Sequence, residues 1–265
     1  MKLTHKLCAA TLLAVLGAAV AVPNAVQAAE TETTTGNPLS FNGQGSIKFL
    51  EDDSVDLPTI PGGGGNTDPE NPIVNPPINP ATGPLKVVAV TDLDFGNDNK
   101  VTPASGNGWE YTAKAAVLEQ KDGTQTTAPN FVQFKDTRAD NKANKHTLTA
   151  KATTFTNGEN QELKSATLQF NNIKLVNEAD QTQVTSAEGA VPTTQNLVTD
   201  GQTPTTFVSQ KEDDKGFGQF TLQFGDTTDN TAADSVKLLI QAQGNKLSTT
   251  SSYTSTITWT IADAR

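Results

Sequence analysis

Short runs in which apolar and polar residues alternate recur from Leu85 to the last residue, and turn-forming clusters separate them. A period of two places successive side chains on opposite faces, as in a β-strand with one buried and one solvated face. The clusters are rich in Gly, Asn and Asp, and no long stretch shows the period of an amphipathic helix. The pattern predicts an all-β fold, an antiparallel β-sandwich with Greek-key or immunoglobulin-like connections.

The alternation also predicts which side chains are buried. The first run, LKVVAVTDLDF, is apolar on both faces and indicates a buried strand. In the later runs the expected inward positions are Tyr111, Ala113, Ala115 and Val117; Leu148, Ala150 and Ala152; Phe220, Leu222 and Phe224; Val236, Leu238, Ile240 and Ala242; and Tyr253, Ile257, Trp259 and Ile261.

The first 28 residues have the layout of a secretory signal peptide. Two lysines precede an apolar run from Leu7 to Val22, and small residues follow at Val26 and Ala28. We expect cleavage after Ala28, which leaves a secreted mature chain.

The mature chain divides into three parts by composition. Residues 29–57 form a polar N-terminal segment in which Ile47 and Phe49 indicate one edge strand. Residues 58–84 contain eight of the 14 prolines and four consecutive glycines. Proline removes backbone donors and glycine adds conformational entropy, so this range is expected to be an extended, mobile linker. The sandwich domain is expected over residues 85–265.

Charge and residue usage exclude several classes of function. The mature chain keeps one histidine, His146, and no cysteine, and it carries 17 Lys+Arg against 29 Asp+Glu, a net charge near −12. One histidine cannot form a zinc site, and no G-x-S-x-G nucleophile motif is present. An acidic chain is poorly suited to nucleic acid, and no later apolar run is long enough to span a membrane. The sequence therefore favours a non-enzymatic binding protein without cofactor or metal.

Two chemical alternatives rest on the acidic residues. The stretch DLDFGNDNK (Asp92 to Lys100) crowds oxygen ligands that calcium could use, but it lacks the D-x-[DN]-x-[DN]-G order of an EF-hand loop. We interpret it as a strand end followed by a turn. A glycosidase needs only two carboxylates at a set separation, and nothing singles out a pair among 29 acids, so a polysaccharide-acting enzyme stays a minor alternative.

Several stretches in order resemble the WxL-domain cell-surface proteins of low-GC Gram-positive bacteria. They are GSIKFLEDD, the linker NPPINPATGPLKV, LDFG, YTAKA, APNFVQFKDTRA, LTAKATTF with LKSATLQFNN, and TITWTIADAR at the C-terminus. The resemblance implies a secreted protein attached non-covalently to the cell wall through its C-terminal domain, with peptidoglycan as the usual ligand. It also implies membership of a multi-protein surface complex. An adhesin or structural subunit that binds host or neighbouring-cell ligands is the alternative.

The chain departs from the family pattern at both signature motifs. His146 stands where the first tryptophan is expected, with Leu148 retained, and the second motif reads Trp259, Thr260, Ile261. The resemblance implies that these five residues contribute to ligand binding. The alternation argues differently for Trp259, because its phase with Ile257 and Ile261 is that of a core position.

Overall fold

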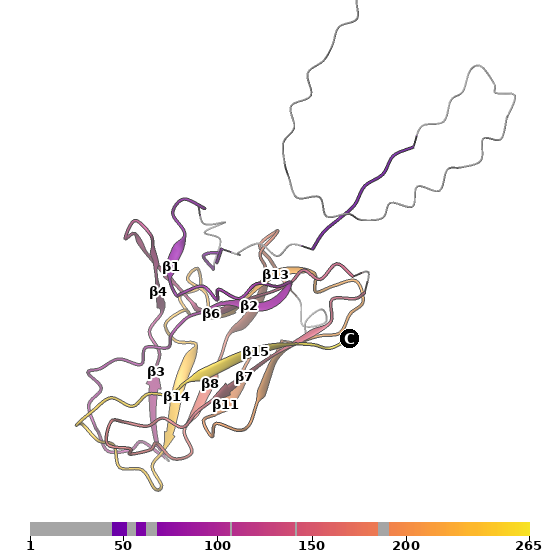
Figure 1. The fold of residues 1–265 in the computed structure, drawn as a ribbon. Coiled ribbons are helices and arrows are strands. Elements are labelled where there is room, and N and C mark those ends of the chain that lie inside the picture. Colours follow the sequence, from indigo (N-terminus) through magenta and orange to yellow (C-terminus); the bar gives the residue numbers. More distant parts are fainter. Residues whose placement is uncertain (1–43, 52–56, 62–67, 107, 141, 185–190) are drawn as a thin grey trace, which may run out of the picture. The chain divides into compact units, whose positions relative to one another are not determined.

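Fifteen β-strands make up the regular secondary structure of the described residues, which contain no helix (Figure 1). The structure is a computed structural model that describes residues 44–51, 57–61, 68–106, 108–140, 142–184 and 191–265. The expected signal peptide lies outside these residues. The strands are β1 (Ile73–Asn75), β2 (Leu85–Val90), β3 (Gly108–Thr112), β4 (Ala116–Gln120), β5 (Gln125–Ala128), β6 (Asn130–Asp136), β7 (His146–Ala152), β8 (Thr167–Phe170), β9 (Ile173–Asn177), β10 (Thr182–Gln183), β11 (Gln195–Val198), β12 (Thr205–Gln210), β13 (Gly218–Phe224), β14 (Val236–Gln241) and β15 (Ile257–Asp263).

All strand pairs are antiparallel, and they form four sheets with the orders β1-β4-β5, β10-β9-β13-β6-β2, β11-β8-β14-β3 and β12-β7-β15. Strand β11 contacts both β7 and β12, which joins the third and fourth sheets edge to edge. These two sheets together form one layer, and the five-stranded sheet forms the layer opposite.

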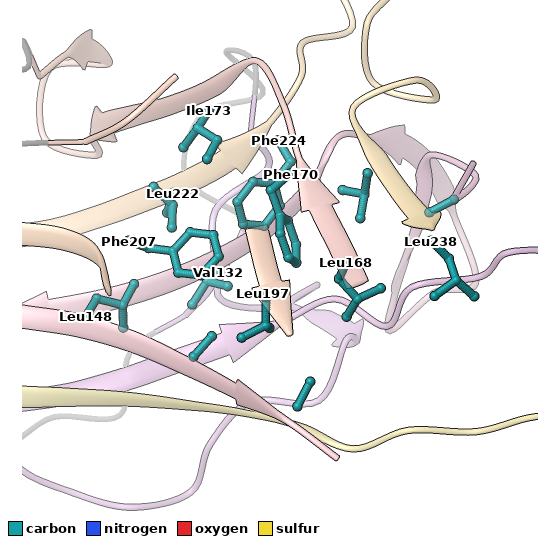
Figure 2. Close-up of a cluster of buried hydrophobic side chains, with 14 of the residues drawn as sticks. Val132, Leu148, Leu168, Phe170, Ile173, Leu197, Phe207, Leu222, Phe224 and Leu238 are labelled. Carbon is teal, nitrogen blue, oxygen red and sulfur yellow. The ribbon is translucent and has the colours of Figure 1, made fainter. Parts of the chain in front are cut away.

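The main hydrophobic core lies between these two layers (Figure 2). The five-stranded sheet contributes Val132 and Leu222, the four-stranded sheet contributes Leu168, and the β12-β7-β15 sheet contributes Leu148 and Phe207. All five side chains are fully buried. The predicted all-β sandwich is confirmed.

Strand β6 is buried on both faces, because a smaller core covers its other side. Phe131 packs there with Ile73 of β1, Val88 of β2 and Leu118 of β4. On the same strand, the side-chain amide of Gln133 exchanges hydrogen bonds with the backbone N–H and carbonyl of Thr59. The β1-β4-β5 sheet and residues 57–61 therefore add a third layer behind the five-stranded sheet.

The run over residues 111–117 is two strands rather than one. β3 ends at Thr112 in the four-stranded sheet, and β4 begins at Ala116 in the three-stranded sheet β1-β4-β5. When the chain passes from one sheet to the other, the set of residues that faces a core shifts by one position. Ala116 and Leu118 are buried, whereas Val117, predicted to face inward, is exposed. An alternating sequence cannot report that the chain leaves one sheet for another.

The range expected to be an extended linker is packed in its described parts. Ile73 is buried in the smaller core, Pro58 and Thr59 are buried, and β1 pairs with β4. The prolines are tolerated because β1 is a short edge strand. Residues 62–67, which include the glycine run, lie outside the described residues. Residues 44–51 adopt no regular structure, so the edge strand expected at Ile47 and Phe49 is not observed.

Candidate functional site

The two motif positions lie on neighbouring strands. Strands β7 and β15 pair along their whole length, with Ile261 opposite Leu148 and Trp259 opposite Ala150. His146, Leu148 and Ala150 are buried, and on β15 the half-buried residues Trp259 and Ile261 alternate with exposed ones. Residues more than 100 positions apart are thus brought onto one face of one sheet.

Trp259 packs into an aromatic cluster at the base of the core. Its ring centroid lies 4.7 Å from that of Phe207, 6.1 Å from Phe224 and 6.2 Å from Phe170. These separations are typical of favourable aromatic pairs. The indole of Trp259 is therefore contacted by strands of three different sheets. Trp259 occupies the core position that the alternation predicted.

The outer face of the same strand pair carries hydroxyl groups. Thr258 and Thr260 are exposed, and Thr149 lies between Thr260 and Thr206 in the register. The Thr149 hydroxyl donates to the Thr260 carbonyl oxygen at 3.4 Å. Of the second motif, Thr260 is therefore the residue whose side chain is most open to a partner.

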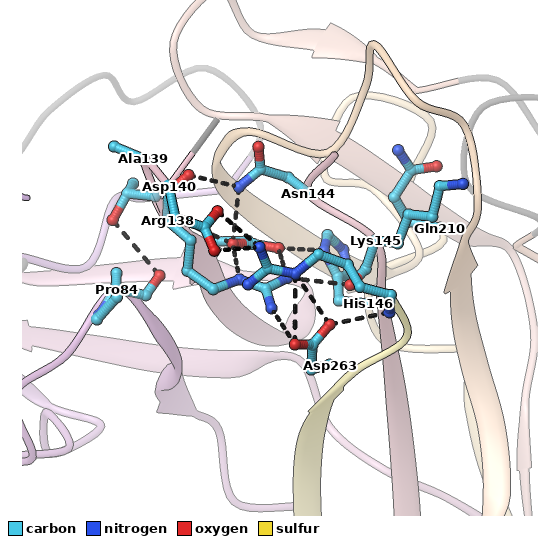
Figure 3. Close-up of polar contacts among 12 residues, drawn as sticks. Pro84, Arg138, Ala139, Asp140, Asn144, Lys145, His146, Gln210 and Asp263 are labelled. Carbon is cyan, nitrogen blue, oxygen red and sulfur yellow. Dashed lines mark hydrogen bonds and ion pairs between the residues drawn. The ribbon is translucent and has the colours of Figure 1, made fainter. Parts of the chain in front are cut away.

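His146 lies in a buried polar cluster at the other end of β7 (Figure 3). Its Nδ1 atom is 3.1 Å from Oδ2 of Asp136, and because a carboxylate can only accept, Nδ1 carries the proton. Arg138 donates two hydrogen bonds to the same carboxylate, at 2.7 and 2.6 Å, and Asn144 donates a third at 2.9 Å. The remaining guanidinium nitrogen of Arg138 pairs with Asp263 of β15 at 2.9 Å. This cluster joins β6, β7 and β15 at one end of the sandwich.

The cluster determines the charge states of its members. Burial alone would raise the pKa of Asp136, but the hydrogen bonds from Arg138, His146 and Asn144 outweigh it and hold this pKa far below its usual range. The same carboxylate raises the pKa of Arg138. The backbone N–H of Arg265 and the Arg138 guanidinium lower the pKa of Asp263 to about 2. The charged groups around His146 are therefore ion-paired, Arg138 with both Asp136 and Asp263. The imidazole ring itself packs against Phe134 and Phe220.

A groove of about 780 Å³ opens at the opposite end of the core. Two continuous segments, residues 90–97 and 247–255, contribute to its lining, and we call their polar side chains its walls. The lining also includes aromatic side chains, which we call its floor, among them the half-buried Tyr111, Tyr253 and Trp259. The volume is in the range of small-ligand pockets, roughly 300–1,000 Å³.

The Asp/Asn-rich stretch considered for calcium forms part of this wall and is internally bonded. Asp94 pairs with Lys114 at 2.9 Å and accepts a hydrogen bond from the Gly96 N–H at 2.7 Å, and these two contacts lower the pKa of Asp94. The Asn99 side chain donates to the Phe95 carbonyl oxygen at 2.8 Å. Among the described residues no group of three or more His, Cys, Asp or Glu side chains could hold a metal ion.

Sequence reasoning missed two parts of these sites. Asp136 and Arg138 were matched within FKDTRA, but their spacing alone gives no sign that both charges are buried. The groove was missed because Tyr111 and Tyr253 are far apart in sequence and each fits a strand pattern equally well. Only the order of strands in the sheets reveals that these two tyrosines, the only ones in the chain, line the same groove.

A comparison with family models identifies the protein family of the chain. The model of the WxL domain, described as surface cell wall-binding, matches residues 33–264. The chain belongs to the WxL family. The match runs through both motif strands and the cluster that joins them. No match was found among curated proteins or among solved structures.

The WxL assignment gives the broad role of the protein. It is a cell-surface protein that binds the cell wall. In the part of the chain that the structure describes, no helix has the length and apolar character needed to cross a bilayer. The structure places His146, the residue expected at the first motif, against Asp136 in the buried polar cluster.

Proposed function

We propose that the mature protein attaches non-covalently to the peptidoglycan of the Gram-positive wall and acts as a binding protein rather than an enzyme. The observation that carries the proposal is the cell wall-binding family match over residues 33–264, which takes in all three layers of the fold. Long-range electrostatic attraction does not contribute to this attachment, because the wall is anionic and the mature chain has a net charge near −12. Attachment must therefore come from short-range contacts with the wall or from a protein partner.

We further propose that the protein works within a multi-protein surface complex. Ile47, Phe49 and Leu50 are 78%, 78% and 80% exposed, respectively, and adopt no regular structure. Three large apolar side chains so close together are unusual on a surface that meets only water. A segment of this kind, which belongs to none of the described sheets, is suited to adding a strand to the sheet edge of a partner protein.

Sedimentation separates the two proposals. The purified mature chain, residues 29–265, is mixed separately with isolated peptidoglycan sacculi, with whole cells that carry the neighbouring surface proteins, and with whole cells that lack them. Sedimentation with sacculi alone supports direct wall binding, and sedimentation only with cells that carry the partners supports attachment through the complex. A variant with Ile47, Phe49 and Leu50 replaced by serine should lose the second kind of binding and keep the first. Failure to sediment with any of these would contradict both proposals.

A further inference from the structure

The groove between residues 90–97 and 247–255 has two distinct kinds of surface. Its floor gathers half-buried aromatic rings: both tyrosines of the chain, Tyr111 and Tyr253, together with Phe95 and Trp259. Aromatic rings cover apolar ligand surface and give it a preferred orientation. A second, smaller hollow has no aromatic lining and is formed by threonine, serine, aspartate and glycine.

The walls of the groove supply neutral hydrogen-bonding groups. Residues 248–252 are consecutive serines and threonines, and Thr254 and Ser255 continue the set after Tyr253. On the opposite side, Asn97 adds a side-chain amide to the lining. Hydroxyls and amides both donate and accept, which matches the alternating hydroxyl and acetamido groups of a sugar chain.

The charge of the lining argues against an anionic ligand. Asp92 and Asp94 are the only charged residues among the described ones that line the groove, and Asp94 is paired with Lys114. A phosphate-bearing wall polymer would meet carboxylate and no free cation here. A neutral amino-sugar chain meets no such repulsion.

Tyr253 is held in position for such a role. Its hydroxyl accepts a hydrogen bond from the backbone N–H of Ser248 at 3.2 Å and lies 3.5 Å from the Gln161 side-chain oxygen. The wall loop is therefore tied to the ring that forms part of the floor. Fixing an aromatic side chain before binding lowers the entropy lost on binding.

We infer that this groove binds the β-1,4-linked N-acetylhexosamine chain of peptidoglycan, with pyranose rings over Tyr111 and Tyr253 and their polar substituents on the hydroxyl and amide walls. The inference rests on the proposed attachment to peptidoglycan and assigns it to named residues. It places the ligand at the end of the core opposite the buried cluster around His146. Thr260, on the outer face of β15, takes no part in it.

The test is a calorimetric titration of the mature chain, residues 29–265, with a soluble β-1,4-linked N-acetylglucosamine tetramer. Tyr253→Ala removes part of the floor, and Ser252→Trp places a bulky ring at an exposed position of the wall without touching the core. Each should weaken binding by about ten-fold or more. Phe217→Ala and Thr258→Trp are the matched controls, at exposed positions outside the groove, and both should bind within about two-fold of the parent.

The outcomes separate this inference from the broader proposal. If the parent sediments with sacculi but does not bind the tetramer, or if Tyr253→Ala and Ser252→Trp both bind it like the parent, the groove assignment is overturned and wall attachment stands. If the tetramer binds and the two groove variants lose it while the parent fails to sediment with sacculi, the groove assignment stands and the broader proposal fails. Ser252→Trp keeps the test informative even if Tyr253→Ala loosens the wall loop.

Discussion

Replacing Trp259 with alanine should destabilise the fold before it affects any ligand. The indole is half-buried and packs against Phe170, Phe207 and Phe224 from three other strands. Truncation of a fully buried tryptophan costs about 3–5 kcal/mol, which includes the cavity it leaves. Because Trp259 is only half-buried, we expect about 3 kcal/mol, which is a large part of a typical stability of about 5–15 kcal/mol.

The assay is urea unfolding followed by far-UV circular dichroism, because the substitution itself changes the fluorescence. For a domain of this size, about 3 kcal/mol corresponds to a fall in Tm of about 6–12 °C. Trp259→Phe keeps a ring in the cluster and should lose less than half as much. Thr258→Ala, at the neighbouring exposed position of β15, should change the free energy of unfolding by less than about 0.5 kcal/mol.

The reasoning about Trp259 would be refuted by a specific result. If Trp259→Ala unfolds at the parent's midpoint yet no longer binds sacculi, the indole is a ligand contact and its packing against the three phenylalanines contributes little. A fall in the midpoint with proportionate loss of binding at the assay temperature would support the structural role.

Three further predictions concern charge and backbone packing. Asp136→Asn should lower the free energy of unfolding by about 3 kcal/mol or more, because it leaves the buried Arg138 guanidinium without its main partner. Asp94→Asn, which breaks an exposed ion pair, should lower it by less than about 1 kcal/mol. Chemical denaturation at pH 7 compares the two variants. The pKa of Asp136 is lowered in the folded state, so its carboxylate contributes fully to folding stability above its unfolded-state pKa of about 3.9, and this contribution is lost as the pH falls below that value. The urea midpoint of the parent should therefore drop between pH 5 and pH 3, and that of Asp136→Asn should drop less. A flat pH profile in the parent would contradict this. Gly108→Ala should strongly destabilise the β3–β14 pair, because its Cβ would lie 1.9 Å from the Ile240 carbonyl oxygen, while Gly45→Ala, with nothing within 4 Å, should be neutral in thermal melts.

The sequence was most informative where one strand has one buried face. The alternation in β7 and β14 assigned the core residues correctly, and for β15 it indicated that Trp259 faces the interior. In β13 the expected Phe220, Leu222 and Phe224 are buried, but so are the two residues between them. Period-two reasoning works there because burial depends only on which face each residue shares with its neighbours two positions away.

The sequence was least informative where burial comes from a distant segment. Nothing local to β6 indicates that Gln133 meets Thr59 across 74 positions, so proline-rich residues that cover the back of the sheet were interpreted as a free linker. The split of the run 111–117 between two sheets has the same cause.

The candidate sites follow the same rule. The resemblance identified the positions of His146 and Trp259 as related motifs, and the strand register explains the relation, because β7 and β15 are neighbours. The pairing of His146 with Asp136 could not be read from the sequence, since Asp136 ends β6, His146 begins β7, and these two strands belong to different sheets. Any role of the five motif residues in ligand binding stays a prediction.

The central claim is non-covalent attachment of the folded chain to peptidoglycan, and a sedimentation isotherm on sacculi stripped of proteins and anionic polymers tests it most directly. The mature chain, residues 29–265, is added at increasing concentration, and the bound fraction is measured before and after denaturing washes. We predict saturable binding that the denaturing wash releases completely. Binding that fails to saturate, is absent on stripped sacculi, or survives the wash would contradict the claim.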